Sequence, residues 1–378
     1  MSETTAWRDA FSNLARFASA KDKPTEESIT AGRMMRYILQ AAARELLPKE
    51  RVAKCLRSVI PAKSEDGHTS DSRRAGVQLL YSAQRQRAFF GNLAQCASVW
   101  HDPVCASKIT ERRRVEMAGV LAGCKYYQLL ATRTFQHSRE DKLAELRADF
   151  ADAKRRVKSG RGWVEIENRF GVIGSIAGLE ATYSQENGFH IHDHSLYLFD
   201  GEIEPEAFRD AMLKRYTVAM DKNGRYVSAI YGLDVRGTND SVGDYVSKWG
   251  IDAELAKYPV KRGHEGHYSA FQLLQLYAEG TTWAGGVFQE YAAAMKGSKQ
   301  LVWSRGLREI LEAGREVTDE ELVDRPEEDA VTLAWLSLAQ WRIILAREKR
   351  GQLLEVASTG NYTDLKNYLR CLGIFLED

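Results

Sequence analysis

The chain has 378 residues, and its composition, 44% hydrophobic and 28% charged, is that of a globular protein with room for two or three domains. No apolar run approaches the ~20 residues that span a membrane, and the N-terminal stretch lacks a signal-peptide pattern. The five cysteines are odd in number and widely spaced, which argues against a disulfide scaffold. We therefore expect a cytoplasmic protein that does not contact a membrane.

The chain divides into four consecutive regions of different character. Residues 1–75 read as a helical region without a recognisable role, and residues 76–119 as a helical segment that contains cysteines. Residues 120–262 alternate between strand-like and helix-like segments. Residues 263–378 carry apolar residues at helical spacing, so we expect this C-terminal domain to be wholly helical.

The third region predicts an antiparallel sheet. The predicted strands are 125–135, 171–184, 189–199 and 226–236, and the predicted helices are 138–158, 204–220 and 240–257. The order β-α-β-β-α-β-α is that of a split βαβ unit. The expected fold class is therefore α+β, with a central antiparallel sheet flanked by helices and with helical N- and C-terminal regions.

Charge is concentrated locally although the net charge is only +1. Five basic residues lie between positions 154 and 161 with no acid among them: Lys154, Arg155, Arg156, Lys158 and Arg161. A second basic cluster spans 108–114, and residues 316–329 are strongly acidic. The basic run at 154–161 is either a solvated helix face or a surface that binds nucleic-acid phosphates.

The predicted strand 189–199 carries three histidines at alternate positions. Alternation turns every second side chain to the same face, so His190, His192 and His194 share a face. Imidazole is the commonest metal ligand, and imidazoles on a rigid strand form half of a metal site. The alternative is that one or more of these histidines only form hydrogen bonds at the surface.

The turn before this strand decides whether a carboxylate can join the histidines, because facing residues on paired strands point to the same side. A two-residue turn would pair Glu180 with Ser195, on the opposite face. A three-residue turn over 186–188, with Gly188 left-handed, would pair Glu180 with His194, and we expect this turn. Two histidines and one glutamate leave coordination positions open, which suits a catalytic ion and admits Mg²⁺ or Mn²⁺.

A tyrosine and a lysine lie three residues apart in the predicted helix 240–257. Tyr245 and Lys248 would share one helix face. A tyrosine can attack phosphorus to form a covalent intermediate, and an ammonium group can hold phosphate charge. Taken alone, the pair is more typical of a packed aromatic ring beside a surface lysine, and its position after the histidine strand is what favours a catalytic role.

The order of these motifs resembles that of the HUH endonuclease superfamily, and in particular the rolling-circle plasmid replication initiators. In this family a strand with paired histidines is followed, after one helix and one strand, by a helix with Tyr-x-x-Lys. Four further segments are similar to family motifs: "CASVWHDPVCASKITERRR" (96–114), "LLATRTFQH" (129–137), "LEATY" (179–183) and "VWSRGLREIL" (302–311). The resemblance extends from about residue 80 to about residue 311.

The resemblance implies a role for each motif, with residues 120–262 as the nicking and joining domain. His192, His194 and Glu180 would be the metal ligands, with His190 as a more dispensable outer ligand. Tyr245 would be the nucleophile and Lys248 its helper. Asp244 or Asp240 would activate water for a terminating hydrolysis. The basic residues of 154–161 would bind DNA phosphates.

The implied function is plasmid replication initiation. The protein would nick and rejoin single-stranded or hairpin origin DNA through a 5′-phosphotyrosine, with Mg²⁺ or Mn²⁺ as cofactor. The 3′-hydroxyl that is left would prime a host DNA polymerase behind a host helicase. The alternatives are a relaxase or transposase of the same superfamily, and a non-catalytic, metal-containing DNA-binding regulator.

Two positions depart from the family pattern. Asp193, between the paired histidines, stands where the family has a hydrophobic residue, and it should point to the opposite face. Asp102 stands where the family has a cysteine, so Cys96 and Cys105 lack the Cys-Pro-x-Cys pair of a zinc knuckle. His101 or Asp102 could replace the missing ligand of a structural Zn²⁺, and the alternative is that both cysteines are ordinary buried residues.

Overall fold

The larger sheet of the protein has the strand order predicted for a split βαβ unit. The computed structural model describes residues 26–60, 76–237, 266–324 and 327–376. The strands of this antiparallel sheet are β3 (Tyr127–Arg133), β4 (Val172–Ser184), β5 (Gly188–Phe199), β6 (Leu233–Gly237), β7 (His267–Tyr268) and β8 (Leu301–Trp303). The order is β6-β3-β5-β4-β7, with β8 also paired to β4. The predicted first and third strands therefore lie side by side at its centre.

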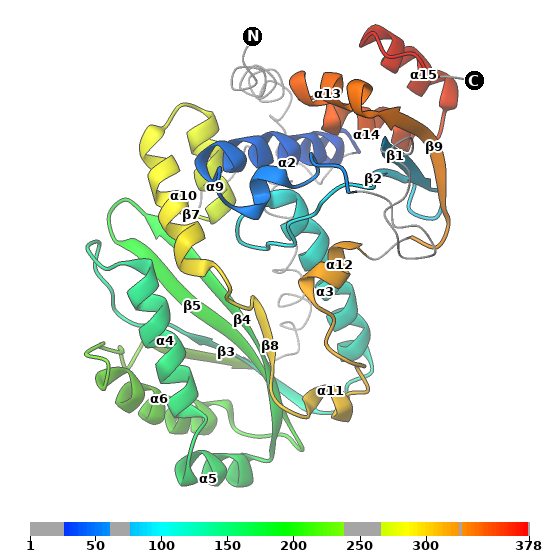
Figure 1. Ribbon diagram of the computed structural model, residues 1–378. Helices are drawn as coiled ribbons and strands as arrows, with labels where there is room; N and C mark the ends of the chain where they lie inside the picture. The colour runs from blue at the N-terminus through cyan, green and yellow to red at the C-terminus, as the bar shows by residue number, and fades with distance from the viewer. Residues whose placement is uncertain (1–25, 61–75, 238–265, 325–326, 377–378) are drawn as a thin grey trace.

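One face of this sheet is covered by α4 (Leu143–Val157) and α6 (Pro205–Asp221), which pack on each other (Figure 1). Aromatic side chains fill this layer: Tyr197 and Phe199 of β5 contact the ring of Phe208 edge-on. Both strand residues are fully buried. A short helix, α5 (Arg161–Phe170), leads from α4 into β4.

The other face is covered only in part by apolar side chains. Helices α3 (Pro103–Ala122) and α11 (Leu307–Ile310) supply part of a small buried cluster on it. Its members are Met117, Leu121, Leu130, Ile176, Leu196, Leu198, Leu301 and Leu307. The last two β5 residues of this face thus lie in a core, whereas the histidines precede them on the same face. The polar end of β5 is therefore the part of this face on which a site can form.

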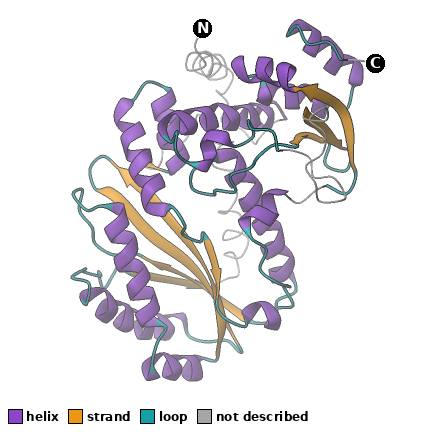
Figure 2. Ribbon diagram, viewed as in Figure 1, coloured by secondary structure: helices purple, strands orange, loops and turns teal. Residues whose placement is uncertain are grey.

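A second sheet joins distant parts of the chain, with the order β2-β1-β9 (Figure 2). Its strands are β1 (Gly76–Ser82), β2 (Arg87–Gly91) and β9 (Ala330–Ser337). The expectation that 263–378 is wholly helical is wrong at β7, β8 and β9, and strands β1 and β2 stand where the predicted segment 76–119 was expected to be helical. The segment AVTLAWLS forms an edge strand because β1 supplies its hydrogen-bonding partner, some 250 residues earlier in the chain.

The remaining helices form a layer above the larger sheet and around the smaller one (Figure 1). They are α2 (Glu26–Leu46), the 3₁₀ helix η1 (Arg51–Lys54), α9 (Ala270–Ala278), α10 (Thr282–Met295), α12 (Asp319–Asp324), α13 (Leu338–Ala346), α14 (Arg350–Ser358) and α15 (Tyr362–Cys371). The α+β class, with helical N- and C-terminal regions, is confirmed. Within the described ranges, no helix combines the length and apolar character needed to cross a membrane.

The predicted strand 226–236 is shorter than expected, because only its last part pairs with β3 as β6. The preceding residues form turns, in which the Gly232 amide donates to the Ser228 carbonyl at 2.8 Å. A Cβ at position 232 would lie 2.6 Å from that carbonyl oxygen, so the turn depends on glycine. Arg209 of α6 fixes this loop by donating to the carbonyls of Ala229 and Leu233.

Candidate metal and catalytic site

The hairpin of β4 and β5 sets the position of the candidate site. Its turn has the predicted length of three residues but covers 185–187, one residue earlier than expected. Gly188 opens β5 with the predicted left-handed φ, +75°, and a Cβ there would lie 2.9 Å from Arg139 Cα. Glu180 therefore faces His192, and the expected partner, His194, faces a glycine instead. The pairing partner of Glu180 thus differs from the expected one by two residues, and Glu180 still lies on the histidine face because alternate residues of a strand share a face.

Glu180, His192 and His194 converge on one point of this face. Oε2 of Glu180 lies 3.1 Å from Nε2 of His192 and 3.7 Å from Nε2 of His194. One ligand atom from each residue lies within 4.8 Å of the others, so the three form a candidate metal-binding group. The histidine side chains are 13% exposed and the glutamate 40%, which leaves the group open to solvent on one side.

Neighbouring groups hold His194 and Glu180 in states that suit the binding of a cation. Thr132 of β3 faces His194, and its hydroxyl lies 2.9 Å from Nδ1 of that ring. A hydroxyl that accepts the Nδ1 proton leaves the Nε2 lone pair for a metal, as the outer partners of metal-bound histidines do. Burial would raise the pKa of Glu180, but hydrogen bonds and charge from His192 and His194 outweigh it and hold that pKa well below its usual range. The carboxylate is therefore ionised at neutral pH.

His190 lies on the same face but has different partners. Its Nδ1 lies 2.9 Å from Nε2 of His137, and its Nε2 lies 3.3 Å from the hydroxyl of Thr134. Burial, together with the charge of His192, lowers the pKa of His190 to about 3, so the ring is neutral at physiological pH. The group formed with Glu180 does not include it. Its role as an outer ligand stays a prediction.

Asp193 points to the opposite face, as expected, and forms a buried ion pair there. Its carboxylate accepts two hydrogen bonds from Arg133 of β3, at 2.9 and 2.7 Å, and both side chains are almost completely buried. Lys154 of α4 lies 3.4 Å from the same carboxylate, and Ser195 accepts a further bond from Arg133. The polar residue is thus satisfied, and it attaches the histidine strand to β3 and α4.

The predicted DNA-binding residues separate into an inner and an outer set. Lys154 and Lys158 point inward: Lys158 lies over the Tyr197 ring at 5.0 Å, and burial lowers its pKa to about 8. The outer set is exposed and consists of Arg155, Arg156 and Arg161. The first two pair with Asp152 on the same helix. DNA contact through either set stays a prediction.

The predicted catalytic residues belong to the segment after β6, which the structure does not describe. Tyr245, Lys248, Asp244 and Asp240 lie outside the described residues, as does the predicted helix 240–257. The described chain before them ends with β6, whose Asp234 faces Thr132 of β3. Since Thr132 itself faces His194, Asp234 is on the histidine face of the sheet.

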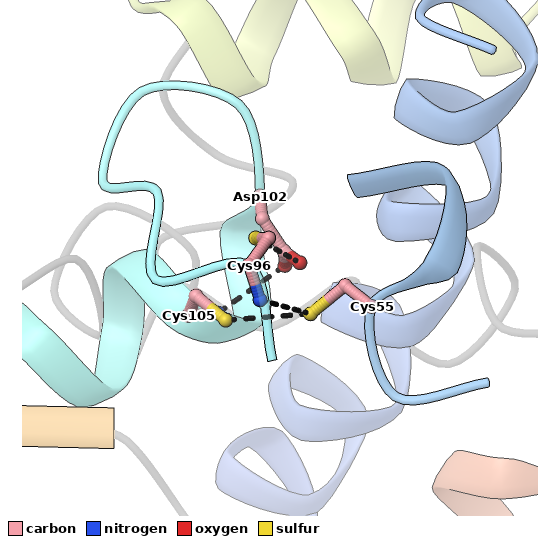
Figure 3. A group of neighbouring side chains, drawn as sticks. All are labelled: Cys55, Cys96, Asp102 and Cys105. Carbon is pink, nitrogen blue, oxygen red and sulfur yellow. Dashed lines mark hydrogen bonds between the residues drawn. The ribbon is translucent and has the colours of Figure 1, made fainter. Parts of the chain in front are cut away.

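A second candidate metal-binding group lies away from the large sheet. It consists of Cys55, Cys96, Asp102 and Cys105, which are all buried (Figure 3). Cys96 and Cys105 are the cysteines that the sequence singles out. His101, the alternative ligand, instead places Nε2 2.9 Å from the carbonyl oxygen of Ala292.

Comparisons with known proteins find similarity to two Streptomyces proteins. It is 23% identical over 312 residues to a Streptomyces lividans protein named "Protein rep", covering 63% of this chain and 68% of the relative. It is also 27% identical over 157 residues to a "Neomycin resistance protein" of Streptomyces cyanogenus, covering 34% of this chain and 36% of that protein. No protein-family model matches the chain, and no solved structure matches it.

Sequence reasoning missed Thr132 and Cys55, which contact or complete the two groups, and His137, which contacts His190 beside the first group. Thr132 could have been found, because it belongs to the predicted first strand and alternation alone places it on one of two faces. His137 lies just beyond that strand and carries no spacing signal. Cys55 is 41 residues before Cys96, in a region without a recognised motif, so only the fold brings it close.

Proposed function

We propose that the protein initiates plasmid replication by nicking and rejoining single-stranded DNA, with residues 120–262 as the nicking domain. The observation that carries the proposal is the convergence of Glu180, His192 and His194 on adjacent strands of a split βαβ sheet. The similarity to a protein named "Protein rep" supports replication as the process.

The donor set fits an open divalent-cation site, and we assign Mg²⁺ or Mn²⁺ to it. Two imidazoles and one carboxylate leave positions for oxygen atoms of a phosphate and water. A bound ion would polarise a DNA phosphate and neutralise part of its charge. Thr132 would hold His194 in the ligating orientation, and Asp193 would hold the strand between the two histidines in place.

We assign Tyr245 as the nucleophile. Its oxygen would bond to phosphorus while the bond from phosphorus to the 3′ oxygen breaks, which leaves a 5′-phosphotyrosine and a 3′-hydroxyl. Lys248 would hold charge on the phosphate, and Asp244 would activate water to end the reaction. Rejoining reverses the first step, so the phosphodiester bond energy is conserved.

The chain between β6 and Tyr245 is long enough for this role. β6 ends at Gly237, which is level with Tyr197 of β5, across β3. His194 is three residues along β5 from Tyr197, and two strand spacings separate β5 from β6. Together these offsets place the end of β6 roughly 14 Å from His194. Tyr245 follows Gly237 by eight residue steps, and an extended chain of eight steps spans up to about 26 Å.

The wider proposal concerns the DNA and its processing. The exposed Arg155, Arg156 and Arg161 would bind backbone phosphates, with an affinity that falls as salt rises. The released 3′-hydroxyl would prime a host DNA polymerase, and a host helicase would unwind the duplex ahead of it. The origin would be presented as a single strand or a hairpin.

A matched pair of histidine variants tests the metal assignment. Single-stranded oligonucleotides are made that cover the replication origin of the DNA molecule that carries the gene for this protein. They are incubated with the protein and Mn²⁺, Mg²⁺ or EDTA. We expect cleavage with either ion, none with EDTA, and a loss of at least about 100-fold in rate for His192→Gln. His190→Gln, on the same face but outside the group, should stay within about 10-fold. Equal losses in both variants, or DNA binding without metal-dependent cleavage, would contradict the proposal.

A further inference from the structure

Three thiols and one carboxylate meet in the interior between the N-terminal region and α3. Cys55 follows η1, Cys96 lies in the loop after β2, and Asp102 and Cys105 belong to the first turn of α3 (Figure 3). None of the four is more than 3% exposed. The remaining cysteines, Cys124 and Cys371, are partly or fully exposed and lie outside this group.

The spacing of the donor atoms fits one tetrahedral ion. The sulfurs of Cys55 and Cys105 are 3.5 Å apart, too far for a disulfide bond of about 2.05 Å. The sulfur of Cys96 is 3.2 Å from Oδ2 of Asp102. Four ligands around Zn²⁺, with Zn–S distances of about 2.3 Å, lie about 3.5 to 3.8 Å from one another. All four donors lie within 4.8 Å of one another, which leaves room for a single ion and not for a multinuclear cluster.

The two oxygens of Asp102 have separate tasks. Oδ1 accepts hydrogen bonds from the backbone amides of Val104 and Cys105, at 2.8 and 3.2 Å, and so caps α3. Oδ2 faces the thiol of Cys96 and accepts from the amide of Gln40 at 2.8 Å. The cap therefore leaves Oδ2 directed at the three sulfurs.

The charge of Asp102 also favours a cation here. This carboxylate is completely buried, and its hydrogen bonds come from the neutral side chains of Gln40 and Cys96 and from backbone amides. The Arg350 guanidinium reaches this carboxylate indirectly, through Gln40, whose Oε1 accepts a hydrogen bond from Arg350 at 2.7 Å. A buried carboxylate is costly unless an opposite charge is bound to it.

We propose that Cys55, Cys96, Cys105 and Asp102 bind a structural Zn²⁺ ion, independently of the ion at the histidine strand. Thiolate ligands favour Zn²⁺ over Mg²⁺ and Mn²⁺, and four protein ligands leave no position for substrate, as in structural sites. The three thiols release their protons on binding. The Gln40–Arg350 pair supports the carboxylate from behind, as outer partners of metal ligands do.

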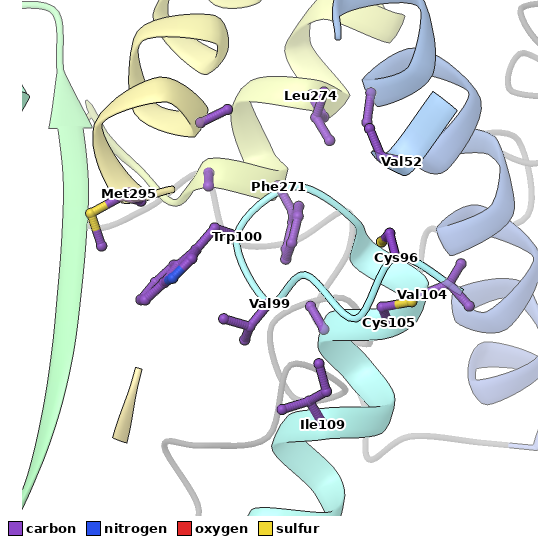
Figure 4. Close-up of a cluster of buried hydrophobic side chains, with 14 of the residues drawn as sticks. Val52, Cys96, Val99, Trp100, Val104, Cys105, Ile109, Phe271, Leu274 and Met295 are labelled. Carbon is purple, nitrogen blue, oxygen red and sulfur yellow. The ribbon is translucent and has the colours of Figure 1, made fainter. Parts of the chain in front are cut away.

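The ion would join parts of the chain that share little regular structure. Around Cys96 and Cys105 are apolar side chains from α3, α9 and the loop before α3, including Val99, Ile109 and Phe271 (Figure 4). Farther along, α3 carries Met117 and Leu121 into the cluster on the histidine face of the sheet. The zinc would thus fix the start of the helix that covers part of the face with the nicking site.

The metal content of the full-length protein tests the proposal. The protein is purified without added metal, and its metal content is measured by inductively coupled plasma mass spectrometry. We expect about one zinc per chain. Cys55→Ser and Cys105→Ser should lower zinc to below about a tenth per chain, whereas Cys371→Ser, a matched control, should keep it. Asp102→Asn keeps the cap and should weaken zinc affinity. The double variant H192Q/H194Q should keep zinc, which separates this site from the proposed nicking site.

A second measurement needs no variant. Titration of the wild-type protein with a thiol-binding mercurial should release zinc, and replacement by Co²⁺ should give a thiolate-to-cobalt charge-transfer band. A wild-type protein without zinc that shows no such cobalt band would overturn the proposal. Zinc that persists in the Cys55 and Cys105 variants, or that is lost in H192Q/H194Q, would overturn it as well.

Discussion

Replacing Asp193 by alanine tests whether the buried ion pair behind the histidine strand holds that strand in place. The carboxylate is completely buried and accepts two hydrogen bonds from Arg133, with Lys154 close by. Among the described residues, Asp193 is the carboxylate that neutralises the buried guanidinium of Arg133, and the substitution removes this charge. Removing one partner of a buried pair destabilises a protein by about 3 to 5 kcal/mol.

The pKa of Asp193 gives an independent magnitude. Burial would raise it, but the charges of Arg133 and Lys154 outweigh burial and lower it to about 2. From an ordinary value near 3.9, the shift corresponds to about 2 to 3 kcal/mol. Because the folded pKa is lowered, this stabilisation is present above about pH 4 and is lost as the pH falls towards 2. The Asp193→Ala cost is larger, because it also leaves Arg133 unpaired.

Urea unfolding at pH 7, followed by circular dichroism, measures the effect. We expect a loss of about 3 to 5 kcal/mol for Asp193→Ala, and a smaller difference from wild type below pH 4. The double variant R133M/D193L removes both charges and should recover most of the stability. The control Asp152→Ala breaks surface pairs with Arg155 and Arg156, and should cost at most about 1 kcal/mol. A loss below about 1 kcal/mol for Asp193→Ala would refute the reasoning.

Two further substitutions test the turn and the outer support of the site. Gly188→Ala should cost about 1 to 3 kcal/mol in urea unfolding, because φ is positive and a Cβ would meet backbone atoms at 2.9 Å; Gly201→Ala, with open space around it, should cost less than about 0.5 kcal/mol. Thr132→Val should weaken Mn²⁺ binding about 10- to 100-fold in calorimetry by removing the hydroxyl at His194. Thr134→Val, a matched change one residue beyond the end of β3, should leave Mn²⁺ affinity within about 3-fold, and equal effects of both variants would argue against a supporting role of Thr132.

The sequence predicts the local parts of this fold well. Strands β3, β4 and β5 and helices α4 and α6 lie where alternation and helical spacing predict them, because each pattern is contained within one element. The predicted facing of Glu180 is also confirmed: this residue joins the histidine face although the turn lies one residue earlier than expected. A register shift of two residues changes the partner but not the face.

Features that depend on contacts between distant parts of the chain could not be predicted from the sequence. β9 looks helical because its apolar residues fit either period, and what makes it a strand is pairing with β1. Cys55 has no neighbour in sequence that marks it as a ligand, and the packing of α2 against both η1 and α3 brings it to Cys105. The side chain of Lys154 points inward because it lies close to the carboxylate of Asp193. That carboxylate is buried only once α4 packs on the sheet, so a local pattern does not reveal the contact.

The covalent protein–DNA adduct is the most direct test of the account. A single-stranded origin oligonucleotide labelled at its 3′ end is incubated with Mn²⁺ and the protein, and the products are separated under denaturing conditions. The account predicts a labelled band at the size of the protein plus the downstream fragment, and its absence for Tyr245→Phe, which should still bind the oligonucleotide. An adduct that persists in Tyr245→Phe, or cleavage by the wild type without any adduct, would contradict the account.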